Sequence, residues 1–328
     1  EFCLTYHNQG DLLGEDNVGV FIAMNKRKIL IAGGGTGGHL FPALAIGEEI
    51  KRREPNAIIH YIGSDFGLEA KVFPVKDVWH TLLPIRGLQR DINLTSILRN
   101  ALLPFRIIKS LFKTKKLLNE FIPDIIIGTG GYASALPLYT ASNIHKKIPI
   151  VLQEQNSYPG ITNKLLSKSV KSIAVAYQGL ERFFPKEKLN LTGNPIRKSI
   201  AEGKLSPTKA KAFFKQIPGI PTLVVLGGSM GAKRINQLIA THLDTFEKQG
   251  LQLIWQCGSL YYDQYKKHQS ERVKIMSFVA EIDKLYAAAD MVISRSGAAT
   301  LSELCCTARP VLLVPSPNVA FGDISTLL

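Results

Sequence analysis

The chain contains 328 residues, of which 45% are hydrophobic and 20% charged, and this composition supports a buried core and excludes an intrinsically disordered protein. At roughly 150 residues per domain the length predicts about two domains, and the lack of an apolar run of about 18 residues argues against a membrane-spanning helix. The meaning of the formal net charge of +14 depends on where the charge is concentrated, because a basic concentration can indicate nucleic acid, anionic lipid or only a solvated face.

Residues 1–23, which precede Met24, show no periodic pattern of apolar side chains. We expect this stretch to be a leader or an upstream extension outside the fold. The four cysteines are sparse, which is typical of a protein of the reducing cytoplasm.

From Lys28 onward, short apolar runs alternate with amphipathic stretches, the pattern of parallel βαβ units. In the first half, the pattern predicts strands at residues 29–32, 58–62, 124–128, 150–153 and 172–176, and helices that include 42–53 and 158–167.

The pattern breaks near residues 193–197, and a lysine-rich helix is predicted at 207–216. A second series of strands follows, at residues 222–226, 251–257, 273–277, 291–294 and 310–314. Because each half begins with a strand, a glycine turn and a helix, we predict an α/β protein of two Rossmann-like domains. Their expected bounds are 24–195 and 196–328.

Residues 33–38 read GGGTGG and match the G-x-G-x-x-G pattern between a strand and a helix. Such a turn lets backbone N–H groups approach a phosphate or a sugar at a helix N-terminus. A nicotinamide cofactor would also need an acid after the second strand, where Asp65 is a late candidate. An ATP-type phosphate loop is excluded because no Lys-Ser/Thr follows, and glycines that serve tight packing alone remain the structural alternative.

Residues 227–231 read GGSMG, which also matches the nucleophile elbow of α/β-hydrolases. That interpretation needs a later Asp and His, but only His242 and His268 follow, in polar and helical surroundings. We therefore interpret Ser229 as a hydroxyl that binds an anion beside free backbone N–H groups.

A third strand, turn and helix spans residues 291–303 and places Glu303 in the second turn of the helix. Its carboxylate can accept hydrogen bonds from two vicinal hydroxyls, although a solvated helical glutamate is the ordinary alternative. Together with the glycine turn at 227–231, this pattern indicates a nucleoside diphosphate, with phosphates on the turns and ribose on the acid.

The chain resembles the MurG family of glycosyltransferases in six motifs that occur in the family's order. They are GGTGGHLFP (34–42), GTGGY (128–132), QEQN (153–156), GNPIR (193–197), GGSMG (227–231) and RSGA with a later Glu (295–303). The resemblance covers residues 24 to about 320. It implies a GT-B fold and inverting transfer of N-acetylglucosamine from UDP-N-acetylglucosamine to lipid-linked N-acetylmuramyl-pentapeptide in peptidoglycan synthesis, without a cofactor.

The resemblance also implies roles for single residues. Thr36, Gly37 and Gly38 resemble contacts to the donor sugar and the acceptor. Asn156, Arg197 and Ser229 resemble donor contacts, the last two near the diphosphate, and Val279 resembles the residue whose backbone binds uracil. The phosphate turn and the ribose acid correspond to Ala298, Ala299, Thr300, Leu301, Ser302 and Glu303.

Transfer requires a general base for the acceptor hydroxyl and positive charge for the departing diphosphate. We expect His39 to be the base or a polarising group, the alternative being a histidine that caps the helix through the backbone. Glu154 is the second candidate base, and Arg197 with the helix start after Ser229 would stabilise the diphosphate. The sequence shows no His, Cys and carboxylate cluster with metal-ligand spacing, so we predict no metal ion held by the protein.

Residues 86–120 contain eight Lys or Arg residues and two acids. Apolar side chains recur there at three- and four-residue steps, with Pro104 breaking or kinking the run: Leu94, Ile97, Ala101, Phe105, Ile108 and Phe112. Together with Arg99, Arg106, Lys109 and Lys113, this pattern predicts a helix on the anionic cytoplasmic face of the cell membrane. A buried face is the alternative, and nucleic acid is disfavoured because no base-stacking motif accompanies the charge.

Two departures from the family pattern matter. The family often has histidine where Gln153 stands, and after Ala320 the sequence leaves the pattern. We therefore expect the C-terminal domain to lack side chains that hold the sugar and a helix that braces the two domains. A UDP-sugar-binding module without catalysis is the alternative function.

Overall fold

The computed structural model describes residues 26–87, 99–144, 147–203, 205–228 and 230–316. The expectations for residues 1–23, for Leu94, Ile97 and Ser229, and for the segment from Pro317 onward lie outside these ranges.

The N-terminal half forms a sheet of seven parallel strands. In spatial order they are β3 (His80–Leu83), β2 (Ile58–Ser64), β1 (Lys28–Gly33), β4 (Ile125–Gly130), β5 (Ile150–Glu154), β6 (Ser172–Val175) and β7 (Leu189–Leu191). The order reverses between β1 and β4, and ligands of such sheets bind outside the carboxyl ends of strands at this point.

Helices cover both faces of this sheet. The helices α1 (Gly37–Arg53) and α2 (Glu69–Val75) pack on one face, and α4 (Leu103–Phe121), α5 (Tyr132–Ile144) and α6 (Ile161–Leu166) pack on the other. Short 3-10 turns complete this half: η1 (Ser167–Ser169), η2 (Leu180–Arg182) and η3 (Lys186–Lys188).

The C-terminal half forms a second parallel sheet of five strands. Their spatial order is β10 (Val273–Met276), β9 (Gln252–Gln256), β8 (Thr222–Leu226), β11 (Met291–Arg295) and β12 (Val311–Val314). One face packs against α7 (Lys198–Ala201), α8 (Pro207–Phe213), α12 (Ile282–Ala288) and α13 (Ala298–Thr307). The other face carries α9 (Lys233–Thr241), α10 (Leu243–Lys248), α11 (Tyr262–Tyr265) and the turn η4 (Lys266–His268).

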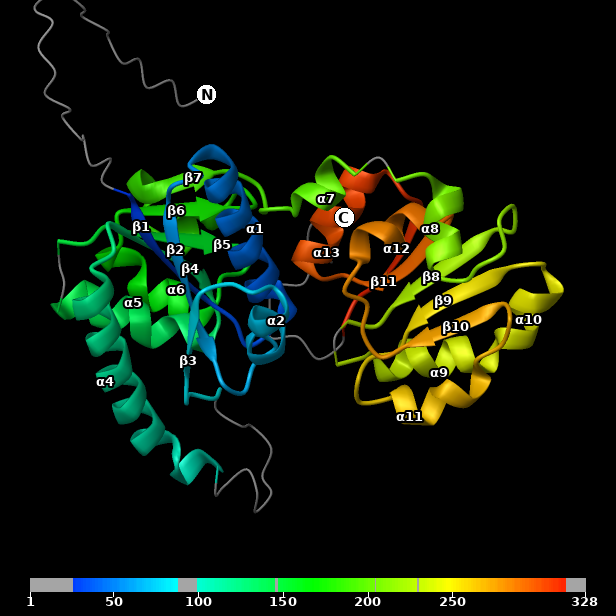
Figure 1. Ribbon diagram of the computed structural model, residues 1–328, viewed down its shortest axis with the longest axis horizontal. Helices are drawn as coiled ribbons and strands as arrows, with labels where there is room; N and C mark the ends of the chain where they lie inside the picture. Colours follow the sequence, from blue (N-terminus) through cyan, green and yellow to red (C-terminus); the bar gives the residue numbers. More distant parts are fainter. Residues whose placement is uncertain (1–25, 88–98, 145–146, 204, 229, 317–328) are drawn as a thin grey trace, which may run out of the picture.

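The predicted α/β class with two Rossmann-like domains is confirmed. The two domains lie side by side, with α1 of the first near α13 of the second (Figure 1). The chain crosses between them from Leu191, where β7 ends, to Lys198, where α7 begins. The predicted domain boundary at 195/196 falls within this crossing.

The bounds of some elements differ from the predictions. The helix α1 begins at Gly37 rather than at 42, so Pro42 lies inside it. Packing overrides the low helix propensity of this turn, because Leu40 is fully buried. The edge strands β3 and β7 were not predicted, since they are only four and three residues long and each includes polar residues.

The helix α4 begins at Leu103, which agrees with the predicted break at Pro104. Proline is tolerated in the first turn of a helix, where its missing N–H needs no partner. Within the described part of the chain, no helix combines the length and the apolarity needed to cross a membrane.

Candidate active site

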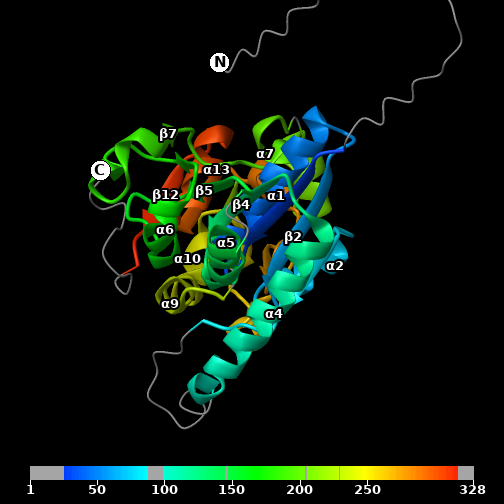
Figure 2. The ribbon, with the colours of Figure 1, turned by 90° about the vertical axis from the view of Figure 1, so that its left-hand side faces the viewer.

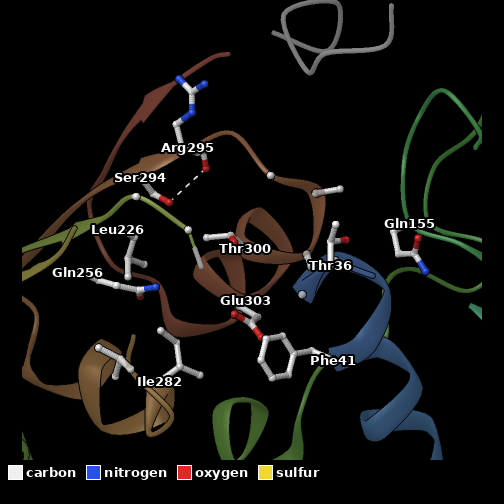
Figure 3. Close-up of a pocket in the computed structure, with 18 of the residues that line it drawn as sticks. Thr36, Phe41, Gln155, Leu226, Gln256, Ile282, Ser294, Arg295, Thr300 and Glu303 are labelled. Atoms are coloured by element: carbon white, nitrogen blue, oxygen red, sulfur yellow. Dashed lines mark hydrogen bonds between the residues drawn. The ribbon is translucent and has the colours of Figure 1, made fainter. Parts of the chain in front are cut away.

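A cavity of about 420 Å³ lies between the two domains, outside the carboxyl ends of the central strands of both sheets. The N-terminal domain contributes the start of α1 and the loop after β5, and the C-terminal domain contributes the turns after β8, β10 and β11 (Figure 3). Most of the predicted site residues line this cavity: Thr36, Gly37, Gly38, His39, Asn156, Arg197, Val279, Ala298, Ala299, Thr300 and Glu303.

Three predicted residues do not line the cavity: Glu154, Leu301 and Ser302. Ser229 lies outside the described residues. The motifs therefore predicted the position of the cavity, but they did not distinguish the residues that line it from adjacent residues of the same motifs.

The imidazole of His39 is held by the N-terminal domain. Its Nδ1 lies 2.9 Å from the carbonyl oxygen of Thr129 and 3.1 Å from Oε1 of Gln155. The hydroxyl of Thr129 donates in return to the carbonyl of His39, at 2.8 Å. Nδ1 therefore binds the backbone of β4 rather than an end of α1, and the residue also lines the cavity.

Glu154 has a different environment from the one that a general base needs. It is 1% exposed, and its carboxylate accepts hydrogen bonds from the backbone and amide nitrogens of Asn156, from the N–H of Gly160 and from the amide of Asn163. These four donors occupy both oxygens. We therefore correct its predicted role: Glu154 fixes the loop that presents Asn156 to the cavity.

A buried carboxylate from α2, which the sequence did not reveal, binds the first glycine turn. Glu69 is fully buried and accepts the N–H of Gly35 at 2.9 Å and the N–H of Ser64 at 2.8 Å. Gly35 has a φ of +90°, and a Cβ there would meet the ring of Tyr132 at 2.6 Å, so only glycine fits. Because Glu69 already occupies this N–H and would repel a phosphate, the structure disfavours a dinucleotide at this turn.

In the C-terminal domain, the start of α13 is suited to an anion. Gly297 precedes the helix, no side chain caps it and its first turn holds no acid. The residues Ala298, Ala299 and Thr300 of this turn line the cavity, opposite Gly227 and Gly228 at the end of β8. Free N–H groups and the helix dipole attract a phosphate here.

Glu303, one turn further along α13, is 8% exposed. Its Oε1 accepts a hydrogen bond from Nη2 of Arg197 at 2.8 Å, and its Oε2 accepts one from the hydroxyl of Tyr286 at 3.0 Å. Burial and the neighbouring Glu303 carboxylate raise the pKa of Tyr286 well above its usual value, so this hydroxyl remains a donor. Glu303 is thus a fixed, partnered carboxylate at the floor of the cavity rather than a solvated one.

Several lining residues were not predicted as site residues: Phe41, Gln155, Leu226, Gln256, Phe278, Ile282, Tyr286, Ser294 and Arg295. Phe41, Gln155 and Arg295 belong to the family motifs GGTGGHLFP, QEQN and RSGA, so the sequence offered a reason to include them. The apolar side chains among the others have no motif, because any strand end or helix of the core could supply them.

The helix α4 lies on the outer side of the N-terminal domain (Figure 2). Three of its apolar side chains form a stripe that is exposed to solvent. The exposed fractions are 72% for Phe105, 52% for Ile108 and 71% for Phe112. The buried-face alternative is therefore wrong for these three residues, and Ser110, Thr114 and Leu118 face the core instead. Lys109 and Lys113 are both exposed on this helix, and Lys113 also donates to the carbonyl of Leu82. Arg106 is half-buried and stacks on Phe66.

Two family models match the chain. Residues 29–175 match the glycosyltransferase family 28 N-terminal domain, and residues 222–324 match the C-terminal domain of the same family.

Curated relatives match most of the chain. The UDP-N-acetylglucosamine--N-acetylmuramyl-(pentapeptide) pyrophosphoryl-undecaprenol N-acetylglucosamine transferase of Flavobacterium psychrophilum is 48% identical, over 90% of this chain and 80% of the relative. The transferase of the same name from Christiangramia forsetii is 44% identical, over 89% of this chain and 78% of the relative.

Solved structures share the fold. The MurG of Acinetobacter baumannii has a TM-score of 0.59 and 22% identity, over 90% of this chain and 80% of that chain. A UDP-GlcNAc 2-epimerase of Neisseria meningitidis, solved with UDP-GlcNAc, has a TM-score of 0.61 and 14% identity, over 87% and 82%. At these identities the structures show the fold alone, whereas the family models and the curated relatives show that the chain belongs to glycosyltransferase family 28 and, within it, to the MurG transferases.

Proposed function

We propose that the protein is an inverting N-acetylglucosaminyltransferase. It moves N-acetylglucosamine from UDP-N-acetylglucosamine to the C4 hydroxyl of undecaprenyl-pyrophosphoryl-N-acetylmuramyl-pentapeptide, converting lipid I to lipid II in peptidoglycan synthesis. The observation that carries the proposal is the cavity between the domains, where His39 from one domain and Glu303 with the start of α13 from the other line the same space.

The C-terminal domain binds the donor. The diphosphate lies at the uncapped start of α13 and at the turn of Gly227 and Gly228, where N–H groups stabilise its charge. The ribose hydroxyls bind Glu303, and the backbone at Val279 binds the uracil. The apolar wall of Leu226, Phe278 and Ile282 supports this half of the site.

The N-terminal domain supplies the base. The C4 hydroxyl of the acceptor attacks C1 of N-acetylglucosamine from the face opposite UDP, and Nε2 of His39 takes its proton. As the new O4–C1 bond forms, the bond from C1 to the diphosphate oxygen breaks, and the electron pair leaves with UDP. The N–H groups at α13 and the guanidinium of Arg197 stabilise that charge.

Arg197 must change partners during this cycle. In the free protein it pairs with Glu303 at 2.8 Å, so a donor whose ribose binds Glu303 competes with the guanidinium. The departing diphosphate offers Arg197 a second acidic partner close by, because both residues line the same cavity.

The exposed apolar stripe on α4 supports peripheral binding of the protein to a membrane. Exposed Phe105, Ile108 and Phe112, with Lys109 beside them, suit an amphipathic surface resting on anionic lipid. The acceptor carries its lipid into the membrane and UDP-sugars are made in the cytoplasm, so we propose a peripheral protein on the cytoplasmic face of the cell membrane.

The test is transfer of radiolabel from UDP-N-acetylglucosamine to the lipid-linked acceptor, with UDP release measured in parallel. We expect label in the lipid phase and one UDP released per sugar transferred. Binding of UDP without any transfer would favour the alternative of a UDP-sugar-binding module. Release of UDP without labelled lipid would indicate hydrolysis and would overturn the proposed acceptor.

A further inference from the structure

We propose that Gln155 is a positioning residue for His39, and that Asn194 and Ser302 hold it in place across the domain boundary. The proposal rests on the proposed function, in which His39 is the base. It assigns an active-site role to the contact between the two domains, because that contact braces the residue that orients the base.

The neighbours of His39 fix its tautomer. Both atoms within hydrogen-bond distance of Nδ1 are oxygens, the carbonyl of Thr129 and Oε1 of Gln155. An oxygen of either kind can only accept, so Nδ1 must carry the proton. The neutral imidazole therefore has its free electron pair on Nε2, which is the form that a base requires.

The orientation of the Gln155 amide is fixed in turn. Its Nε2 donates to the carbonyl of Thr129 at 2.7 Å and to Oε1 of Gln153. Turning the amide over would bring its oxygen against both of these acceptors. Gln155 is 2% exposed, so water does not compete for these bonds, and its Oε1 stays directed at His39.

The support for Gln155 comes from the linker and from the other domain. Asn194 accepts a hydrogen bond from the amide of Gln153 at 3.3 Å and donates to the backbone carbonyl of Gln155 at 3.2 Å. The same Asn194 amide lies 3.0 Å from Oγ of Ser302 on α13. A continuous set of hydrogen bonds thus runs from Ser302 in the C-terminal domain to His39 in the N-terminal domain.

The proposal also assigns roles to Ser302 and Gln153, which do not line the cavity. Ser302 was predicted to contact the donor, but it faces Asn194, one residue before the acid Glu303. Gln153, where the family often has histidine, supplies both a donor and an acceptor to the network. A change in the position of α13 would reach Gln155 through Asn194, which binds its backbone carbonyl, and would remove one support of its position.

Two variants of Gln155 test the proposal by shifting the pH–rate profile in opposite directions. Gln155→Met keeps the side-chain length but removes one of the two acceptors for Nδ1 and leaves the carbonyl of Thr129, which disfavours the imidazolium formed in the transition state. We expect kcat to fall by about 10- to 100-fold, little change in the KM for the donor, and an acidic limb moved to lower pH. Gln155→Glu places a carboxylate beside Nδ1, and its acidic limb should move to higher pH.

The matched control is Gln252→Met. Gln252 is also a buried glutamine with several hydrogen bonds, but it lies away from the cavity, on β9. This variant should lose thermal stability and leave the pH–rate profile in place. If the Gln155 variants behaved in the same way, Gln155 would be a structural residue and the proposal would be wrong.

Combining Gln155→Met with His39→Ala separates this proposal from the function on which it rests. If Gln155 acts through His39, the double variant should be no slower than His39→Ala alone. A further loss in the double variant would overturn the proposal.

If His39→Ala itself kept normal turnover, the role of His39 in the proposed function would fail. An inactive His39→Ala beside fully active Gln155 variants would refute this inference alone.

Discussion

Nη2 of Arg197 lies 2.8 Å from Oε1 of Glu303, and the two side chains are only 14% and 11% exposed. The guanidinium also stacks over the ring of Phe41 in α1, with 4.5 Å between its carbon and the ring centroid. One linker residue therefore touches both domains and the acid that we assign to ribose. Removing one partner of such a buried pair leaves the other charge uncompensated, which makes each residue sensitive to substitution.

Glu303→Ala should weaken the binding of UDP and of UDP-N-acetylglucosamine by about 10- to 100-fold. This range corresponds to the ~1.5–3 kcal/mol of hydrogen bonds to a charged group. Calorimetric titration with UDP measures the effect. The control is Glu202→Ala, because Glu202 forms an exposed pair with Lys198 within one helical turn. Equal UDP affinity in both variants would remove Glu303 from the site.

His39→Ala should reduce turnover by about 100-fold or more and leave donor binding nearly unchanged, because a base acts in the transition state. The measurement is kcat for transfer beside the Kd for UDP. The exposed His242, at the end of α9, provides the control His242→Ala. A change confined to donor affinity would assign His39 to binding.

Replacing Phe105 and Phe112 with Ser should release the protein from anionic vesicles. Each fully inserted phenylalanine contributes about 1.5–3 kcal/mol, so the double change, worth about 3 kcal/mol or more, should weaken binding by about 100-fold or more. Sedimentation with vesicles at low and high salt measures the affinity. Leu260→Ser is the control, because Leu260 is 65% exposed in the other domain. Equal sedimentation of the two proteins would exclude α4 as the membrane surface.

The fold was predictable where local signals were strong. Runs such as Thr222–Leu226 end in glycines and lead to helices, and the structure places that strand at the predicted residues. The strand Leu189–Leu191 gave no such signal, since only pairing with Ser172–Val175 makes it a strand. A periodic pattern of apolar residues arises where one face of a helix or strand is buried. A short edge strand buries too few side chains to produce such a pattern.

The sequence predicted which motifs form the site, but it did not predict which hydrogen-bond partners their side chains have. Glu154 and Glu303 both belong to family motifs, yet Glu154 accepts hydrogen bonds from four donors of the chain around it, whereas Glu303 binds Arg197 and Tyr286. Glu69 lies 34 positions from the N–H of Gly35 that it occupies. Which N–H groups are free is decided by such long-range contacts, and no spacing in the sequence encodes them.

The stability of the N-terminal domain should depend on pH through His60. This residue is 2% exposed beside Trp79 and Phe121, and its Nδ1 has no hydrogen-bond partner. Burial, and to a lesser extent the charge of His80, lower the pKa of His60 from 6.5 to about 4. Unfolding therefore takes up a proton between these pH values, and the free energy of unfolding should fall as pH drops through that window, by at most about 1.4 kcal/mol per pH unit. His60→Phe cannot take up this proton, so denaturant titrations across the window should show a weaker pH dependence than in the wild type. His242→Ala, which removes an exposed histidine, should keep the wild-type dependence. If His60→Phe and the wild type lost stability in parallel, His60 would not be the group that titrates.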